Sequence, residues 1–188
     1  MRLLIYGSKE FAHTVADLVR HCGHELVGMV DDFNSGPQIL GTFDTVVHAF
    51  PPSEYGFAIA VGYADIPGRW AVWQKIFAKG YRAPALIHPR AYVADTAQVG
   101  EGCMVMAAAI VDVRAKLDEL AVVWPGSCIN HDVVVGSNTF VSPGVTICGA
   151  SRIGSNTFIG AGTVIADHCE IPAGSFIKMM TRYSNVQL

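Results

Sequence analysis

A histidine and an aspartate, His131 and Asp132, interrupt an otherwise small and aliphatic stretch, WPGSCINHDVVVG (residues 124–136). Imidazole takes up and releases a proton near neutral pH, so His131 is a candidate general base. The competing interpretation is that His131 only caps a turn by hydrogen bonding. A base supports group transfer when a hydrogen-bond donor for the developing oxyanion lies beside it. Whether His131 can act as a catalytic base therefore depends on its neighbours in the folded chain.

A second set of polar residues follows two apolar stretches near the N-terminus, RLLIYG (2–7) and HELVGMVDD (24–32). If both stretches are parallel strands, Gly7, Ser8, Asp31 and Asp32 lie at the ligand-binding edge of the sheet. Gly7 and Ser8 would face a phosphate at the N-terminus of the next helix, and the two acids could accept hydrogen bonds from a ribose or a base. The loop is not a GxGxxG motif, so an ordinary turn is the competing interpretation.

The elements around this set alternate between strand and helix. Helical spacing of apolar residues runs through 10–23, a further strand is expected at 56–62, and a second helix at 66–79. Such alternation predicts a parallel sheet with helices on its faces. We expect a Rossmann-like α/β domain over residues 1–88.

The second half carries a repeat of six residues. From Val93 to Ile177, every sixth residue is aliphatic, and the residue four positions after each is small or Val. This period predicts an all-β left-handed parallel β-helix over residues 89–188, in which the aliphatic positions stack inward. The aliphatic positions are Val93, Val99, Val105, Val111, Leu117, Val123, Ile129, Val135, Val141, Ile147, Ile153, Ile159, Ile165, Ile171 and Ile177.

Three hexads make one coil of such a helix, so residues eighteen apart lie one above the other at the strand spacing of about 4.8 Å. One coil above His131 is Gly149, which has no side chain. A group held near His131 could therefore reach the N–H of Gly149. A general base beside an oxyanion donor is the arrangement that direct acyl transfer requires. Gly144 and Gly162 share another column, where an elongated ligand could lie close to the backbone.

Composition excludes several classes of protein. The formal net charge of −3 provides no basic surface for nucleic acid or for an anionic membrane. The start, MRLLIYGSKEFAH, is unlike a signal peptide, so a cytoplasmic protein is expected. The five cysteines show no CxxC spacing, and the repeat region holds only two histidines, His131 and His168, about two coils apart. A metal-dependent lyase or hydratase would need more ligands, so no metal is expected.

Several segments together are similar to the NeuD/PglD-like bacterial sugar O- and N-acetyltransferases. These segments are YGSKEFAHTVADLV, VGMVDD, the LIHP joint, INHDVVVGSNTFVSPGVTICG, IGSNTFIGAGTVI and EIPAGS. The resemblance covers nearly the whole chain. It implies an acetyltransferase that uses acetyl-CoA as co-substrate and a nucleotide-linked amino sugar or a sialic-acid-like sugar as acceptor. It also implies a homotrimer with active sites between adjacent β-helices, and no metal.

The resemblance also implies roles for individual residues. His131 would be the base, Asp132 would orient it, and the Gly149 N–H would bind the thioester oxygen. Because neighbours on a strand point to opposite faces, the contact between His131 and Asp132 must involve a corner or another subunit. Gly160, Ala161 and Gly162 would line the pantetheine arm of coenzyme A, with Gly144 in the same column as Gly162. In the first domain, Gly7, Asp31 and Asp32 would hold the nucleotide-linked sugar, with Ser8 in the same loop as Gly7.

Three departures leave alternatives open. Ser8-Lys9-Glu10 replaces a glycine-rich loop, and Phe140 replaces a second histidine of the family motif. At the C-terminus, FIKMMTRYSNVQL (176–188) stands where the family has a further coil. Lys178 and Arg182 could reach the phosphates of coenzyme A, or this segment could be a tail that packs between subunits. The alternatives are therefore a non-catalytic paralogue that binds a sugar nucleotide and a transferase that uses a different acyl donor.

Overall fold

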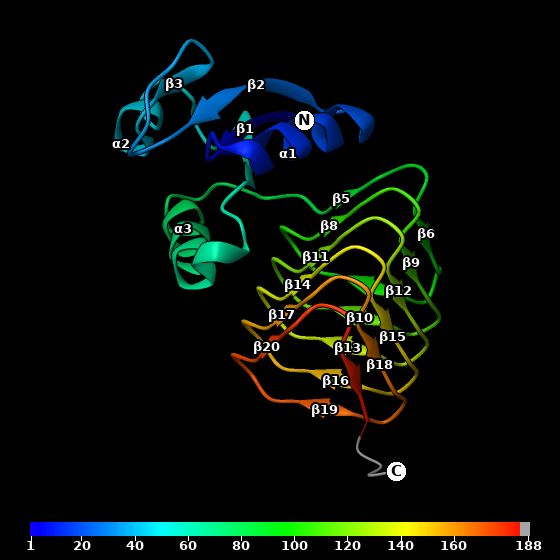
Figure 1. Cartoon of the computed structure of the whole chain (residues 1–188). Coiled ribbons are helices and arrows are strands. Elements are labelled where there is room, and N and C mark those ends of the chain that lie inside the picture. The colour runs from blue at the N-terminus through cyan, green and yellow to red at the C-terminus, as the bar shows by residue number, and fades with distance from the viewer. Residues whose placement is uncertain (185–188) are drawn as a thin grey trace. The chain divides into compact units, whose positions relative to one another are not determined.

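The computed structural model describes residues 1–184 of the chain. The chain divides into two compact units, Met1–Leu86 and Ile87–Leu188, which are considered separately below (Figure 1).

The first unit is the expected short α/β region, built on a parallel four-stranded sheet. Three consecutive residues of the central strand, Leu3, Leu4 and Ile5, are fully buried, as are Val15 and Val19 of the first helix. The strand order is β3-β2-β1-β4, so the direction of winding reverses between β1 and β4. Open α/β sheets bind ligands at the carboxyl ends of the strands where the order reverses. The elements are β1 (Arg2–Tyr6), α1 (Glu10–His21), β2 (Glu25–Val30), β3 (Ile39–Gly41), α2 (Phe43–Val46), β4 (Tyr55–Ile59), a 3₁₀ turn (Tyr63–Asp65) and α3 (Ile66–Ala78).

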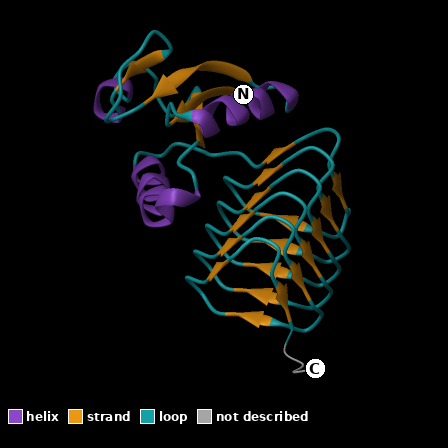
Figure 2. Cartoon of the chain, in the orientation of Figure 1, coloured by secondary structure: helices purple, strands orange, loops and turns teal. Residues whose placement is uncertain are grey.

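The second unit is the expected left-handed parallel β-helix. Short strands lie along the three edges of each coil (Figure 2), and within residues 1–184 they form parallel sheets of five, six and six strands. The strands are β5 (Leu86–Ile87), β6 (Tyr92–Val93), β7 (Gln98–Val99), β8 (Met104–Val105), β9 (Ile110–Val111), β10 (Lys116–Leu117), β11 (Val122–Val123), β12 (Cys128–Ile129), β13 (Val134–Val135), β14 (Phe140–Val141), β15 (Thr146–Ile147), β16 (Arg152–Ile153), β17 (Phe158–Ile159), β18 (Val164–Ile165), β19 (Glu170–Ile171), β20 (Phe176–Ile177) and β21 (Arg182–Tyr183).

The register confirms a coil of eighteen residues. Val123 pairs with Val141, and Ile129 pairs with Ile147. All four of these aliphatic side chains have no exposed surface, because each coil covers the apolar interior of the next. The chain turns at corners where the backbone adopts positive φ, for example 58° at Asn138, whose side chain donates to Asn156 Oδ1 one coil further (2.8 Å). The corner columns are therefore fixed by both register and conformation.

The C-terminal segment does not depart from the β-helix at residue 176. Strand β20 pairs with β17 and β21 pairs with β18, so the ladder continues to Tyr183. The predicted packing tail is therefore part of the β-helix over most of its length, and its last four residues, 185–188, lie outside the described residues. Phe140 lies in a stacked aromatic column with Phe158 and Phe176, at centroid separations of 6.2 and 4.8 Å. This column gives Phe140 a packing role at the position where the family motif has histidine.

Candidate active site

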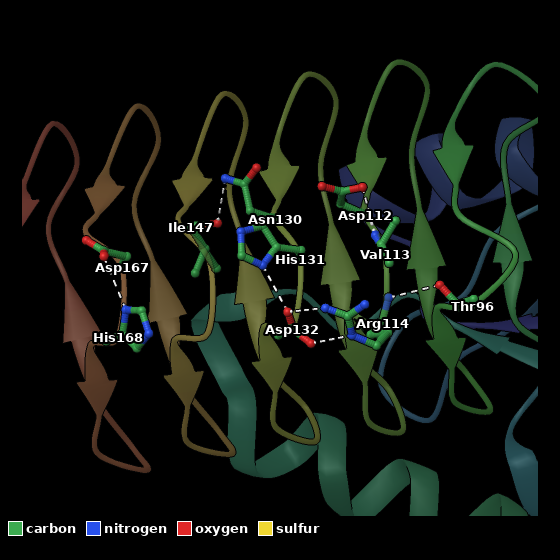
Figure 3. A network of polar contacts seen from close by, with 10 residues as sticks. All are labelled: Thr96, Asp112, Val113, Arg114, Asn130, His131, Asp132, Ile147, Asp167 and His168. Carbon is green, nitrogen blue, oxygen red and sulfur yellow. Dashed lines mark hydrogen bonds and ion pairs between the residues drawn. The ribbon is translucent and has the colours of Figure 1, made fainter.

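His131 and Asp132 lie at the corner between β12 and β13. Asp132 has φ of 60°, in the left-handed region, and its N–H donates to the carbonyl of Val113 one coil below (3.0 Å). This conformation turns the backbone, so the two adjacent side chains meet instead of pointing to opposite faces. The separation between His131 Nδ1 and Asp132 Oδ2 is 2.9 Å (Figure 3). The pair is thus formed at a corner within one chain.

The carboxylate of Asp132 also binds Arg114, which lies one coil below it. Arg114 Nε donates to Oδ1 (2.7 Å) and Nη2 donates to Oδ2 (2.8 Å). These hydrogen bonds, followed by the one to His131, hold the pKa of Asp132 well below its ordinary value. An ionised carboxylate only accepts hydrogen bonds, so Nδ1 of His131 must carry a proton. In the neutral ring the lone pair is then on Nε2.

Gly149 lies directly against this ring. A Cβ atom built on Gly149 would be 2.6 Å from His131 Nε2, so any larger residue would displace the imidazole. Within residues 1–184, the N–H of Gly149 has no hydrogen-bond partner, whereas its carbonyl accepts from the N–H of His168 (3.0 Å). His131 itself is largely exposed, with 58% of its side-chain surface accessible. The structure therefore brings together an accessible proton acceptor and a backbone donor that is free to bind a ligand oxygen.

The other three predicted glycines of the β-helix do not lie at this corner. Gly144, Gly160 and Gly162 lie at the corner that follows β14 and β17 and precedes β15 and β18. Strands of one whole sheet, β12-β15-β18, separate this corner from that of His131. Within one chain, the structure therefore brings together His131, Asp132 and Gly149, whereas Gly144, Gly160 and Gly162 lie at a different corner.

The local reasons for these glycines also differ. A Cβ on Gly160 would collide with the backbone nitrogen of Met179 in the next coil, so close packing alone requires glycine there. Gly144 has φ of 67° and open space where a side chain would lie. Gly162 has φ of 68°, and its open side is occupied by Met180, whose Sδ is 2.6 Å from the built Cβ. Gly144 thus leaves an exposed backbone surface, whereas Met180 covers Gly162.

In the first unit, all four predicted residues line one pocket of about 1000 Å³, at the carboxyl ends of β1, β2 and β4. Gly7 has φ of 111°, and a Cβ there would lie 2.9 Å from the carbonyl oxygen of Ala60 at the end of β4. Glycine is therefore required for the close approach of the loop after β1 to β4. The pocket lies at the carboxyl ends of the strands, as the sequence pattern predicted, and at the point where the strand order reverses between β1 and β4.

The two acids of this pocket are already engaged. Asp31 is 6% exposed and accepts hydrogen bonds from Ser8 Oγ (2.6 Å), from the N–H groups of Phe33 and Asn34, and from the Asn34 amide. Burial alone would raise the pKa of Asp31, but these hydrogen bonds lower it overall. Asp31 therefore orders the loop around the pocket, and little of its surface remains for a ligand.

Asp32 is held by residues that the sequence pattern did not identify. It accepts hydrogen bonds from Tyr6 Oη (2.6 Å), Lys75 Nζ (2.8 Å) and the N–H of Phe43 (2.7 Å). Burial raises the pKa of Asp32, whereas Lys75 and Tyr6 lower it, and the net shift is downward. Burial and the Asp32 carboxylate raise the pKa of Tyr6. Lys75 and Tyr6 line the same pocket and add a cation and a phenol to it.

The ion pair of Lys75 predicts a pH-dependent stability. Because the folded-state pKa of Asp32 is below its ordinary value of 3.8, its contribution is present above that value and is lost as the pH falls through the folded pKa. Lys75→Gln is expected to lower the free energy of unfolding at pH 7 by about 1 kcal/mol, since the pair is partly screened by solvent. Urea unfolding between pH 3 and 7 measures this effect. The matched control is Lys79→Gln, an exposed lysine at the end of the same helix; equal losses in both variants would contradict the role of the ion pair.

Among residues 1–184, no three or more His, Cys, Asp or Glu side chains are grouped so as to hold a metal ion. None of the helices in this part of the chain has the length and apolar character needed to cross a membrane.

Comparisons with known proteins agree with both units. Residues 2–76 match the family model of the PglD N-terminal domain. The acetyltransferase domain of PglB from Neisseria gonorrhoeae, solved in complex with acetyl coenzyme A, is 26% identical, with a TM-score of 0.80 over 94% of this chain and 95% of that one. A mutant of perosamine N-acetyltransferase from Caulobacter crescentus, in complex with CoA and GDP-perosamine, is 23% identical, with a TM-score of 0.78 over 95% and 93% of the two chains, and supports the fold. The chain is therefore similar to the PglD N-terminal domain over residues 2–76 and to the PglB acetyltransferase domain over nearly its whole length, in agreement with the resemblance to the NeuD/PglD-like sugar acetyltransferases.

Proposed function

We propose that this chain is a cytoplasmic acetyltransferase that moves an acetyl group from acetyl-CoA to a nucleotide-linked amino sugar or a sialic-acid-like sugar in bacterial glycan biosynthesis. The observation that carries the proposal is the contact of the His131 ring with Gly149, whose N–H is available to a ligand. The similarity to the PglB acetyltransferase domain, which was solved with acetyl coenzyme A, supports the choice of donor.

In the proposed reaction, His131 Nε2 takes a proton from the acceptor amine or hydroxyl as that group attacks the thioester carbonyl. The Gly149 N–H donates a hydrogen bond to the carbonyl oxygen as negative charge develops on it. The carbon–sulfur bond then breaks, and the imidazolium returns its proton to the leaving thiolate. The products are an acetylated sugar and free coenzyme A, so atoms and charge balance. Asp132, held ionised by Arg114, stabilises the transient imidazolium.

The open corner around His131 supports a homotrimeric enzyme. A single chain provides the base and the oxyanion donor on an exposed surface, while Gly144, Gly160 and Gly162 lie at another corner. We propose that a neighbouring copy brings its glycine corner to the His131 corner, and that coenzyme A lies between the two. The pocket around Gly7, Ser8 and Lys75 would hold the nucleotide part of the acceptor, with Lys75 favouring an anionic group.

Calorimetric titration with acetyl-CoA, in parallel with free coenzyme A, tests the choice of donor. Dissociation constants in the micromolar to sub-millimolar range are expected, since most enzymes hold their substrates in that range. Thiol release with GDP- and UDP-linked amino sugars then tests transfer. If neither acetyl-CoA nor coenzyme A binds while a sugar nucleotide raises the melting temperature, the protein is a sugar-nucleotide-binding paralogue or uses another acyl donor.

A further inference from the structure

We propose that Arg114 is a positioning residue of the active site, which holds the Asp132 carboxylate so that Asp132 fixes the ring of His131. The proposal deepens the proposed function and rests on it, because a fixed ring matters only if His131 acts as the base. Arg114 does not contact the reacting atoms. It acts by holding the carboxylate of Asp132, which in turn orients the His131 ring.

Arg114 and Asp132 form a bidentate guanidinium–carboxylate contact. Nε and Nη2 of Arg114 bind different oxygens of Asp132, at 2.7 and 2.8 Å (Figure 3). Two parallel hydrogen bonds fix the plane of the carboxylate, which one hydrogen bond from His131 cannot do. Oδ2 then receives both Arg114 Nη2 and His131 Nδ1. The orientation of the imidazole is thereby linked to the position of the guanidinium.

The backbone places Arg114 for this task. Arg114 is separated from Asp132 by eighteen residues and occupies the equivalent corner position one coil below, with φ of 55° against 60° for Asp132. Its N–H donates to Thr96 Oγ1 on the coil below that (3.1 Å). The corner column therefore stacks an arginine directly beneath the aspartate.

A contribution to folding stability does not explain why Arg114 and Asp132 form a bidentate ion pair. The side chain of Arg114 is 63% exposed and that of Asp132 is 37% exposed. Exposed ion pairs contribute little to folding, because solvent screens them and ordering two side chains opposes them. The bidentate pair instead fixes the tautomer and the orientation of the His131 ring. These two properties decide where the lone pair that accepts the proton lies.

Arg114 also affects the charge near the base. Charged and titratable groups on the coils around this corner include Asp112 and Arg114 one coil below, Cys128 on the same coil, Cys148 one coil above, and Asp167 and His168 two coils above. Arg114 is the cation that contacts the His131–Asp132 pair directly.

Two substitutions separate geometry from charge. Arg114→Lys keeps the charge but loses the fork, so kcat is expected to fall about tenfold with little change in KM. Arg114→Gln loses both, so kcat should fall about 10- to 100-fold, again with little change in KM. Lys116→Gln is the matched control: it removes a cation paired with Asp118 (2.8 Å) in the same coil, and should leave kcat and KM unchanged.

The tautomer of His131 can be measured without enzyme activity, so the positioning role of Arg114 can be tested independently of the proposed reaction. Nitrogen-15 NMR of histidine-labelled protein should show His131 in the Nδ1–H tautomer in the wild type and in Lys116→Gln, and a mixture of tautomers in Arg114→Gln. If His131 keeps a single Nδ1–H tautomer in Arg114→Gln, the positioning role is wrong, whatever the enzyme activity. If the tautomers change as expected but the wild type transfers no acetyl group, the positioning stands and the proposed reaction fails.

Discussion

Replacing His131 with asparagine is expected to lower kcat by about 10³-fold while the affinity for acetyl-CoA stays within about twofold of the wild type. A positioned general base contributes about 10²- to 10⁴-fold to a rate, and an amide cannot accept the proton of the attacking group. Asparagine keeps a polar side chain of similar reach, and His131 is largely exposed, so the fold should survive. Thiol release at saturating substrate measures kcat, and calorimetric titration measures donor binding.

His168→Asn is the matched control for this prediction. His168 lies at the same corner two coils further, also beside an aspartate, with 3.1 Å between its Nδ1 and Asp167 Oδ2. Among residues 1–184, no glycine covers its ring in the way that Gly149 covers that of His131. His168→Asn should therefore retain kcat. If His131→Asn turned over at the wild-type rate, or if both variants lost the same fraction of activity, His131 would not be the base.

The β-helix and its central contact were predictable from the sequence because the fold is almost one-dimensional. Each coil contacts only its neighbours, so a period of six residues gives the register, and a step of eighteen gives the column. That step placed Gly149 above His131, and the structure confirms the contact. The same step places Arg114 beneath Asp132. The signal for this arginine was therefore present, and it would have been found by following the column of Asp132 downward.

The same period also places Gly144 and Gly162 in another column than His131, whereas the resemblance assigned Gly160 and Gly162 to the site without separating the corners. The polar contacts of the first unit could not be obtained from such a period: Asp32, which follows β2, meets Tyr6 of β1 and Lys75 of α3, and no local pattern links residues 43 positions apart in the sequence. The acids were located correctly at the pocket, but their partners depend on tertiary packing.

The conformation of the corner explains how adjacent residues form the His131–Asp132 pair. In an extended strand, consecutive side chains point to opposite faces. Positive φ is costly for residues other than glycine, although aspartate and asparagine tolerate it better than most. Asp132 therefore serves as both the turning residue and the partner of His131. The sequence required a corner or a second subunit for this contact, and the structure selects the corner.

Gly149→Ala is expected to lower kcat/KM by about 10²- to 10³-fold, because one methyl group disturbs both elements of the site. The built Cβ lies 2.6 Å from His131 Nε2, so the ring must swing away, and the methyl group occupies space beside the N–H that would bind the oxyanion. Stability should change by less than about 1 kcal/mol. The φ of Gly149 is outside the positive range that disfavours alanine, the exposed ring can move, and replacing glycine restricts the unfolded chain.

Ala150→Gly is the control in the same turn. Ala150 has φ of 57°, so glycine is compatible with its backbone and adds no atom near His131; kcat/KM should remain that of the wild type. The double variant His131→Asn/Gly149→Ala then separates the two effects of the methyl group. If Gly149→Ala acted only by displacing the ring, it would cost nothing further once His131 is asparagine. A remaining loss of about tenfold or more in the asparagine background is expected, since the oxyanion donor is also obstructed. A Gly149→Ala variant with full activity would contradict both roles, because neither the position of the ring nor access to the N–H would then matter to the reaction.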